Sequence, residues 1–420
     1  MSGIERARGD TADEGTCVVH DIGELVVGPS EDADTQLEIR EDAALAAVDG
    51  EVVAVGASDE VTREYPPENA DTAIDADGRA VVPGFVDPHT HAVFAGDRSD
   101  EFEAKLQGKE YQEILAEGGG ILRTVRAVRE ASEDQLVATL TSHLETMLEH
   151  GTTTIEVKSG YGLDTETELE LLAAIDRAAD AQPAALVPTF MGAHAVPDGK
   201  DAEAYVDEVV AEQLPAVAEQ GVAEFCDVFC EDGVFDVDQS RRVLEAGREH
   251  DLSPKVHAEE FTRLGGAQLA ADLGAVSADH LLYATDDDIG ALCEAGVVPV
   301  LLPGTAFGLG EAYADARAFL EAGAPVALAT DFNPNCHSRS MEFVQTLAAV
   351  EMGLTPAEAL LATTRNAALA LGLEDGTGTL REGAPADAVV LEAPSYAHIA
   401  YRFDTSAVDA VLKAGEVVAE

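Results

Sequence analysis

The sequence predicts an α/β protein: a (β/α)8 TIM-type barrel joined to a small β-rich domain formed from both chain ends. Two observations support this fold class. The middle of the chain alternates short apolar runs with longer segments of helical periodicity. The two ends instead contain short β patterns separated by turn residues. We assign residues 83–370 to the barrel, and residues 1–82 and 371–420 to the composite terminal domain.

The terminal domain is predicted from hairpin patterns at both ends. Ala43–Val55 is apolar on both sides of Asp49-Gly50, a dipeptide that favours a tight hairpin turn. Near the other end, Asp387–Leu391 is an apolar run, and Val408–Val418 repeats the hairpin form around Ala414-Gly415. Because two β-rich ends flank a different middle, we expect them to build one domain together.

The barrel is predicted from eight apolar runs of strand length. In chain order they are Val81–Val86, Thr153–Val157, Ala185–Phe190, Phe225–Phe229, Lys255–Ala258, Val276–His280, Val297–Leu302 and Val326–Thr330. The segments between them are rich in Ala, Leu and Glu at helical spacing, and include Glu166–Ala179, Ala202–Glu219, Asp238–Glu249 and Asp286–Glu294. Eight strands alternating with helices is the pattern of a closed parallel barrel.

The charge of the chain excludes several classes of partner. Asp and Glu outnumber Lys and Arg by 81 to 25, which gives a formal net charge of −56 at pH 7. Such a surface repels the phosphates of nucleic acids and anionic lipids. Hydrophobic residues still make up 46%, so a large core is available. The acidity is spread along the chain, which favours a halophilic protein of a salt-rich cytoplasm over a merely acidic mesophilic enzyme.

Cysteine usage and the absence of apolar segments predict a cytoplasmic location. The five cysteines are Cys17, Cys226, Cys230, Cys293 and Cys336. An odd number in a long chain is typical of buried free thiols in a reducing compartment. Met1–Asp10 lacks the apolar core of a signal peptide. No apolar run approaches the roughly 18 residues that cross a membrane, so we expect a soluble protein.

Reactive or turn-forming side chains follow several strand candidates at their carboxyl ends. These segments are Asp87–His91, Lys158–Gly162, Gly192–His194, His257–Glu260, Asp279-His280 and Asp331–Pro334. In a barrel the carboxyl ends of all strands converge on one face, where active sites are built. We therefore expect segments that are far apart in the sequence to meet at one mouth.

The histidines among these segments indicate a metal site. His89 and His91 lie two residues apart at the end of the first strand candidate, so both imidazoles point to one side. This pair alone is a weak signal. His257 ends the fifth candidate, His280 the sixth and Asp331 the eighth. Three imidazoles and one carboxylate could hold a divalent ion and leave a position for water, whose pKa the ion lowers toward neutrality.

The segment around His89 and His91 resembles the signature of a known family. Pro83-Gly-Phe-Val-Asp-Pro-His-Thr-His91 resembles the signature of the amidohydrolase superfamily. The resemblance implies a metal-dependent hydrolase with a distorted barrel and a small β-sandwich from both chain ends. Within the superfamily the chain is most similar to the imidazolonepropionase family. The supporting segments are His91–Arg98, Gly118–Val125, Glu156–Leu163, Met191–His194, His257–Glu260, Ala278–His280 and Thr330–Pro334.

The resemblance implies a reaction and a cofactor. The reaction is hydrolysis of the cyclic amide C–N bond of 4-imidazolone-5-propanoate to N-formimidoyl-L-glutamate, a step of histidine degradation. His89, His91, His257 and Asp331 resemble the ligands of one Zn²⁺ or Fe ion. Two-metal members carry a carboxylated lysine at the end of the fourth strand, where this chain has Phe229–Asp232. A single metal is therefore expected.

The family's catalytic residues carry over to three positions. Glu260 resembles the general base that activates the bound water, and its position relative to His257 favours it over the adjacent Glu259. His280 resembles the residue that stabilises the developing oxyanion or relays a proton. Asp331 is also a candidate for delivering the proton to the leaving nitrogen.

The substrate carries a propionate, which needs a positive partner in so acidic a protein. By resemblance, the substrate-binding residues are Arg98 for the carboxylate, together with Tyr161, His194, Glu260, Asn333 and Asn335. The competing readings are a surface salt bridge for Arg98 and a packed rim aromatic for Tyr161. Asn335-Cys336-His337 departs from the Gly and small hydroxyl residue that many bacterial members have there.

Two other functions stay open from the residues. One is a mononuclear deaminase of a heterocyclic base, for which Arg98 would have no carboxylate to bind. The other is a catalytically inactive scaffold barrel, which would lose metal ligands that are all present here. The expected partner is a small-molecule substrate, with no nucleic acid and no membrane. Because relatives are often dimers, a homodimer is a further possibility.

Overall fold

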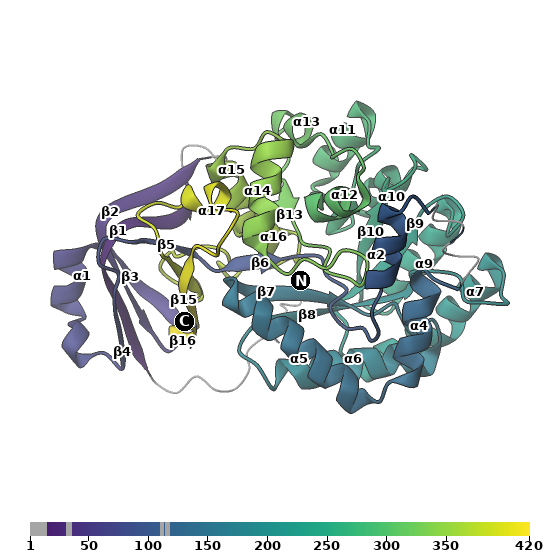
Figure 1. Cartoon of the computed structure of the whole chain (residues 1–420), viewed down its shortest axis with the longest axis horizontal. Coiled ribbons are helices and arrows are strands. Elements are labelled where there is room, and N and C mark those ends of the chain that lie inside the picture. Colours follow the sequence, from purple (N-terminus) through teal and green to yellow (C-terminus); the bar gives the residue numbers. More distant parts are fainter. Residues whose placement is uncertain (1–14, 31–35, 110–112, 114–117) are drawn as a thin grey trace.

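The computed structural model describes residues 15–30, 36–109, 113 and 118–420. Two eight-stranded sheets organise these residues, one in the barrel and one in the terminal domain (Figure 1). The predicted fold class is confirmed: a parallel barrel carries a second sheet built from both chain ends. The prediction for Met1–Asp10 lies outside the described residues.

The barrel strands run parallel in chain order around the ring. They are β6 (Phe85–Asp87), β7 (Thr152–Lys158), β8 (Ala185–Ala193), β9 (Phe225–Cys230), β10 (Ser253–Ala258), β11 (Ser277–His280), β12 (Val298–Leu301) and β13 (Ala327–Leu328). Just beyond their carboxyl ends, β6 and β13 are joined by a parallel bridge between Thr90 and Phe332. The amide of Asp331 donates to the carbonyl of His89 there. The ring therefore closes at the edge where functional side chains were expected.

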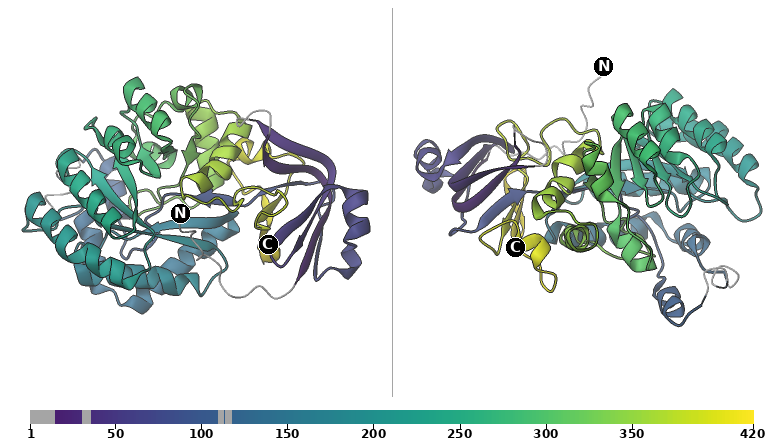
Figure 2. Two further views of the ribbon diagram at one scale, coloured as in Figure 1. Left: turned by 180° about the vertical axis from the view of Figure 1, so that it is seen from behind. Right: turned by 90° about the horizontal axis from the view of Figure 1, so that it is seen from above.

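Helices surround the barrel strands (Figures 1 and 2). They are α2 (Ser99–Leu106), α4 (Ile121–Glu130), α5 (Glu133–Glu149), α6 (Thr165–Ala179), α7 (Ala202–Glu208), the π-helix η2 (Val209–Gln213), α8 (Leu214–Gln220), α9 (Val237–Glu249), α10 (Gly266–Leu273), α11 (Asp286–Ala295), α12 (Pro303–Leu309), α13 (Ala316–Glu321), α14 (Met341–Glu351), α15 (Pro356–Ala362) and α16 (Arg365–Leu369). Acidic residues begin several of them. Asp164, Asp201 and Asp236 accept backbone N–H bonds at the starts of α6, α7 and α9.

The terminal domain combines strands from both chain ends. Its sheet runs in the order β16 (Glu416–Ala419), β15 (Val408–Lys413), β14 (Ala388–Leu391), β5 (Ala80–Pro83), β1 (Thr16–Pro29), β2 (Leu37–Val48) and β3 (Glu51–Ala57), and β4 (Thr72–Asp75) also pairs with β1. Two short helices complete it, α1 (Ser58–Glu64) and the 3-10 helix η1 (Pro67–Asn69), whereas α17 (His398–Tyr401), between β14 and β15 in the chain, packs against α14 and α15 of the barrel.

The terminal sheet folds over one core and also packs against the barrel. Val19, Leu45, Val81 and Val390 come from strands along the whole path and share a single hydrophobic core. On the opposite face of β5 and β14, alternate residues such as Val389 join the core of the barrel. The β5–β14 layer therefore lies between the two domains, which adjoin in both views of Figure 2.

The predicted strand Val81–Val86 is wrong as a single element. The chain crosses from one sheet to the other within it: β5 pairs with β1 and β14 in the terminal sheet, and β6 pairs with β7 in the barrel. Gly84 stands at the crossing. A Cβ at this position would overlap the side chain of Thr153, lying 2.6 Å from its Cγ2. The close packing of the Thr153 side chain against the Gly84 backbone explains why glycine occupies the crossing.

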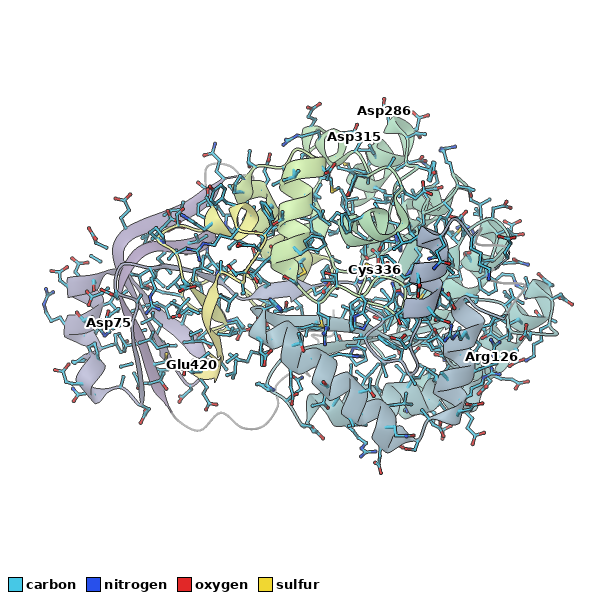
Figure 3. The ribbon with its side chains drawn as sticks, in the orientation of Figure 1. Asp75, Arg126, Asp286, Asp315, Cys336 and Glu420 are labelled. Carbon is cyan, nitrogen blue, oxygen red and sulfur yellow. The ribbon has the colours of Figure 1, made fainter. Side chains whose placement is uncertain are left out.

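Among the described residues, none of the helices has the length and apolar character needed to cross a membrane. All five cysteines are free thiols, and Cys336 lies in the interior. Acidic side chains such as Asp286 and Asp315 project from the outer helices (Figure 3).

We expect Gly84→Ala to lower the free energy of unfolding by about 1–3 kcal/mol, because the added methyl overpacks the contact with Thr153. Thermal or denaturant unfolding measures the change. The matched control is Gly290→Ala in α11, where an added Cβ meets no atom within 4 Å; it is expected to be neutral or slightly stabilising. Equal stability of the two variants would contradict the crossing argument.

Candidate metal centre at the barrel mouth

His89 and His91 reach the mouth on the segment that follows β6. Because β6 ends at Asp87, the two histidines lie beyond the strand, which corrects the prediction that they end it. The bridge from Thr90 to Phe332 keeps the segment extended, so both imidazoles still point to one side. Their Nε2 atoms lie 3.6 and 3.7 Å from Oδ1 of Asp331. All three side chains are buried.

His257 and His280 complete the cluster from the ends of β10 and β11. Nε2 of His257 lies 3.3 Å from Nε2 of His91. The His280 ring is centred 5.1 Å from the His257 ring and 5.3 Å from that of His89. Possible ligand atoms lie within 4.8 Å of one another in three linked groups: His89, His91 and Asp331; His89, His257 and His280; and Asp227, His257 and Asp279. The structure thus brings together all four predicted ligands and also His280.

The unpaired nitrogen of His89 shows that these residues suit a metal. Its Nδ1 is bonded to Oδ2 of Asp279 at 2.7 Å, whereas its buried Nε2 has no hydrogen-bond partner and faces Asp331. A buried polar atom without a partner is costly. Imidazole nitrogens and a carboxylate oxygen are the donors that Zn²⁺ and Fe accept. The residues therefore fit a divalent ion, and the individual ligand assignments stay predictions.

Two residues of the cluster adopt left-handed backbone conformations. The φ angles are +50° at Asp331 and +78° at His280. Such conformations cost about 1–3 kcal/mol each in residues other than glycine and persist where the surroundings hold them. Asp331 is held by its N–H bond to His89 and by the hydroxyl of Thr305, which donates to its carboxylate. The strained backbone positions are therefore those of Asp331 and His280, two residues whose side chains converge at the mouth.

A buried lysine joins the carboxylates that lie behind the histidines. Nζ of Lys158 lies 2.8 Å from Oδ2 of Asp227, 2.7 Å from Oε2 of Glu156 and 3.7 Å from Oδ2 of Asp279. The same Asp227 oxygen lies 3.0 Å from Nδ1 of His257. Burial alone would lower the pKa of Lys158, but the three carboxylates raise it, so the lysine stays charged.

A second buried lysine extends this network. Nζ of Lys255 lies 2.9 Å from Oε1 of Glu156 and donates to the carbonyl of Pro88, next to His89. Sequence reasoning missed the positioning roles of Glu156, Asp227 and Lys255, and treated these residues as parts of apolar strands. The available signal was a charge inside an otherwise apolar run, as at Asp227 within Phe225–Phe229.

The structure separates the two neighbouring glutamates, Glu259 and Glu260. Glu259 accepts backbone N–H bonds from Leu264, Gly265 and Ala267, and so holds the loop that begins α10. Glu260 instead faces the cluster, with Oε2 at 3.6 Å from Nε2 of His280. Burial, together with the negative charge of Asp331, raises its pKa well above the ordinary value. Of the two, only Glu260 is placed to exchange protons at the mouth.

The predicted substrate residues line the same region. His194 stacks on His91 with ring centroids 4.7 Å apart, and the Tyr161 ring is centred 5.9 Å from that of His91. Arg98 is buried and forms an ion pair with Glu101 at 2.9 Å, so it is no surface salt bridge.

The loop after Asp331 holds the two predicted asparagines. Asn333 donates to the carbonyl of Asp331 at 2.8 Å and accepts the N–H of Asn335 at 2.7 Å. The Asn335 side chain accepts a hydrogen bond from Lys105 at 2.7 Å. Both asparagine side chains therefore organise this loop, and their contacts with a substrate stay predictions.

We expect Asp279→Asn to weaken metal binding about 10- to 100-fold, because the carboxylate that orients the His89 ring is lost. Competition with a chelator, followed by metal analysis, measures this. The matched control is Asp387→Asn, which breaks a buried pair with Lys413 at 2.6 Å in the terminal domain. Both variants should lose stability, but only the first should lose metal affinity. Unchanged metal affinity in Asp279→Asn would refute the orienting role.

Comparison with known proteins identifies the relatives of this chain. The model of the amidohydrolase family matches residues 80–418. An imidazolonepropionase from Haloarcula marismortui is 69% identical over 401 residues, which cover 96% of this chain and 95% of that protein. An imidazolonepropionase from Symbiobacterium thermophilum is 52% identical over 90% of both chains.

Solved structures share the fold at low identity. An adenosine deaminase from Xanthomonas campestris with bound zinc superposes with a TM-score of 0.72 at 18% identity, covering 95% of this chain and 92% of that one. An atrazine chlorohydrolase from Arthrobacter aurescens complexed with zinc gives 0.70 at 17% identity, covering 96% and 95%. At these identities the similarity shows the fold alone.

Proposed function

The chain belongs to the amidohydrolase family and, within it, to the imidazolonepropionase family, and from this premise we propose that it hydrolyses 4-imidazolone-5-propanoate to N-formimidoyl-L-glutamate. The bond broken is the cyclic amide C–N bond. One observation carries the proposal. The buried carboxylate of Glu260 lies at the same mouth as the cluster of His89, His91, His257 and Asp331.

Water activation is the first task of the site. We propose that His89, His91, His257 and Asp331 hold a single Zn²⁺ or Fe ion. Such an ion, when bound, polarises the carbonyl and lowers the pKa of water. Glu260 takes the proton of the attacking water, because burial and the charge of Asp331 raise its pKa and so make its carboxylate a stronger base.

Charge and protons must then move to the leaving nitrogen. His280 lies 3.6 Å from Glu260, where its ring can stabilise the developing oxyanion or relay the proton. Asp331 is the alternative donor to the leaving nitrogen. Arg98, Tyr161, His194 and the Asn333–Asn335 loop bind the rest of the substrate in this proposal.

We expect Glu260→Gln to lower kcat by a factor of about 10² to 10⁴ while metal content is unchanged, because the amide cannot accept the proton. Turnover of freshly generated 4-imidazolone-5-propanoate, with metal measured on the same sample, checks this. Glu259→Gln is the matched control: it should lower the melting temperature through the α10 loop and reduce kcat far less. Full activity of Glu260→Gln would disprove the base assignment.

The wild-type assay also tests the reaction itself. Formation of formimidoylglutamate supports the proposal. Failure to consume 4-imidazolone-5-propanoate, together with release of ammonia from a heterocyclic base, would replace it with a deaminase. Absence of bound metal and of both activities would favour a scaffold barrel.

The setting of the enzyme is part of the proposal. We propose a halophilic, cytoplasmic enzyme with a small-molecule substrate and no nucleic-acid or membrane partner. The net charge of −56, five free thiols and the relative from Haloarcula marismortui support this setting. Homodimer formation stays a prediction.

We expect the melting temperature to rise between about 0.2 M and about 3 M KCl, because salt screens the repulsion among acidic side chains. Differential scanning calorimetry measures the change. An uncharged osmolyte at equal osmolality is the control and should give a smaller rise. A melting temperature that is flat or falls with KCl would contradict adaptation to salt.

A further inference from the structure

The arginine expected to bind the propionate is already neutralised. Nε and Nη2 of Arg98 both lie 2.9 Å from Oε2 of Glu101. Oε1 of Glu101 accepts the N–H of Gly120 and lies 3.5 Å from Arg123, which itself pairs with Asp100. The cluster of two arginines and two carboxylates has no net charge. A substrate carboxylate that approaches Arg98 therefore also meets the negative charge of Glu101.

Lys105 brings an uncompensated positive charge to the same place. It lies one helical turn after Glu101 on α2, on the same side of the helix. Its half-buried Nζ donates to the neutral amide oxygen of Asn335, 2.7 Å away. Among the residues that the structure describes, no carboxylate forms an ion pair with Lys105. The ammonium of Lys105 is thus hydrogen-bonded to the neutral Asn335 amide, and its positive charge is not neutralised by an ion pair.

Lys105 is bonded to the loop that follows Asp331 and lies close to Arg98. Asn335 is bonded to Asn333, and Asn333 to the carbonyl of Asp331, so α2 is joined to the mouth through this loop. Burial and the nearby charge of Arg98 lower the pKa of Lys105, and the charge of Glu101 offsets only part of that lowering. A bound carboxylate would offset both effects, because it would place a negative charge directly beside the ammonium.

We propose that Lys105 binds the carboxylate of the substrate together with Arg98, and that Asn335 holds its ammonium in place when no substrate is bound. The proposal rests on the proposed function, since it concerns an acid substrate. Arg98 supplies a planar fork already fixed by Glu101, and Lys105 supplies the net charge that an anion needs in a protein of net charge −56.

The test compares Lys105→Met with Lys200→Met, an exposed lysine paired with Glu208. Both substitutions change the net charge equally. We expect Lys105→Met to raise KM for 4-imidazolone-5-propanoate at least tenfold with little change in kcat. Lys105→Arg should recover most of the affinity, and Lys200→Met should behave as wild type. Equal KM values in Lys105→Met and Lys200→Met would overturn the proposal.

Inhibitor binding separates carboxylate recognition from a merely structural link. The probes are imidazole-4-propanoate and 4-methylimidazole, which lacks the carboxylate, both used at a pH above the pKa of the imidazole ring. Lys105→Met should weaken the acid at least tenfold and leave binding of 4-methylimidazole unchanged. A lower melting temperature with both inhibition constants unchanged would show only a link between α2 and the Asn335 loop, and would overturn the proposal. If the wild type lacks the proposed activity but Lys105→Met still loses the acid selectively, the reaction fails while carboxylate recognition stands.

Discussion

The candidate metal centre depends on one buried ammonium among three carboxylates. Lys158 pairs with Glu156 and Asp227 and lies 3.7 Å from Asp279. Asp227 and Asp279 in turn lie against Nδ1 of His257 and His89. Without the lysine, like charges would crowd the centre of the barrel, and an unpaired buried charge is strongly destabilising. Lys158 therefore neutralises the buried carboxylates Asp227 and Asp279. These two carboxylates in turn orient the imidazoles of His257 and His89 toward the mouth.

The barrel was predictable because its strands are short apolar runs and its reactive residues follow them. The ends of β10 and β11 alone supply His257 and His280. The pattern could not tell which sheet a strand joins, so the crossing at Gly84 was missed. It also could not reveal the role of Asp227, because its partner Lys158 comes from a different strand and meets it only when the barrel closes. A residue whose role depends on a partner far away in the sequence can be recognised only from the folded barrel.

Charge is distributed differently outside and inside the molecule. On the surface, single arginines bridge pairs of acids between neighbouring helices, as Arg242 does with Glu203 and Asp207. Inside the barrel, the two buried lysines, Lys158 and Lys255, lie among buried carboxylates that include Glu156, Asp227 and Asp279. The overall charge of −56 is therefore a property of the solvated exterior. For the acid substrate that we propose, the pairing of each cation at the mouth matters more than the number of cations in the chain.

Because the chain crosses between the two sheets at Gly84, the terminal sheet cannot be completed until the barrel strands have been synthesised. β5 emerges early from the ribosome, yet one of its two neighbours, β14, lies close to the end of the chain. All barrel strands are made before that neighbour appears. A nascent chain can therefore close the barrel while β5 is still an unpaired edge of the terminal sheet. Unpaired edge strands of this kind promote aggregation. Synthesis of β14, β15 and β16 completes the sheet and covers that edge.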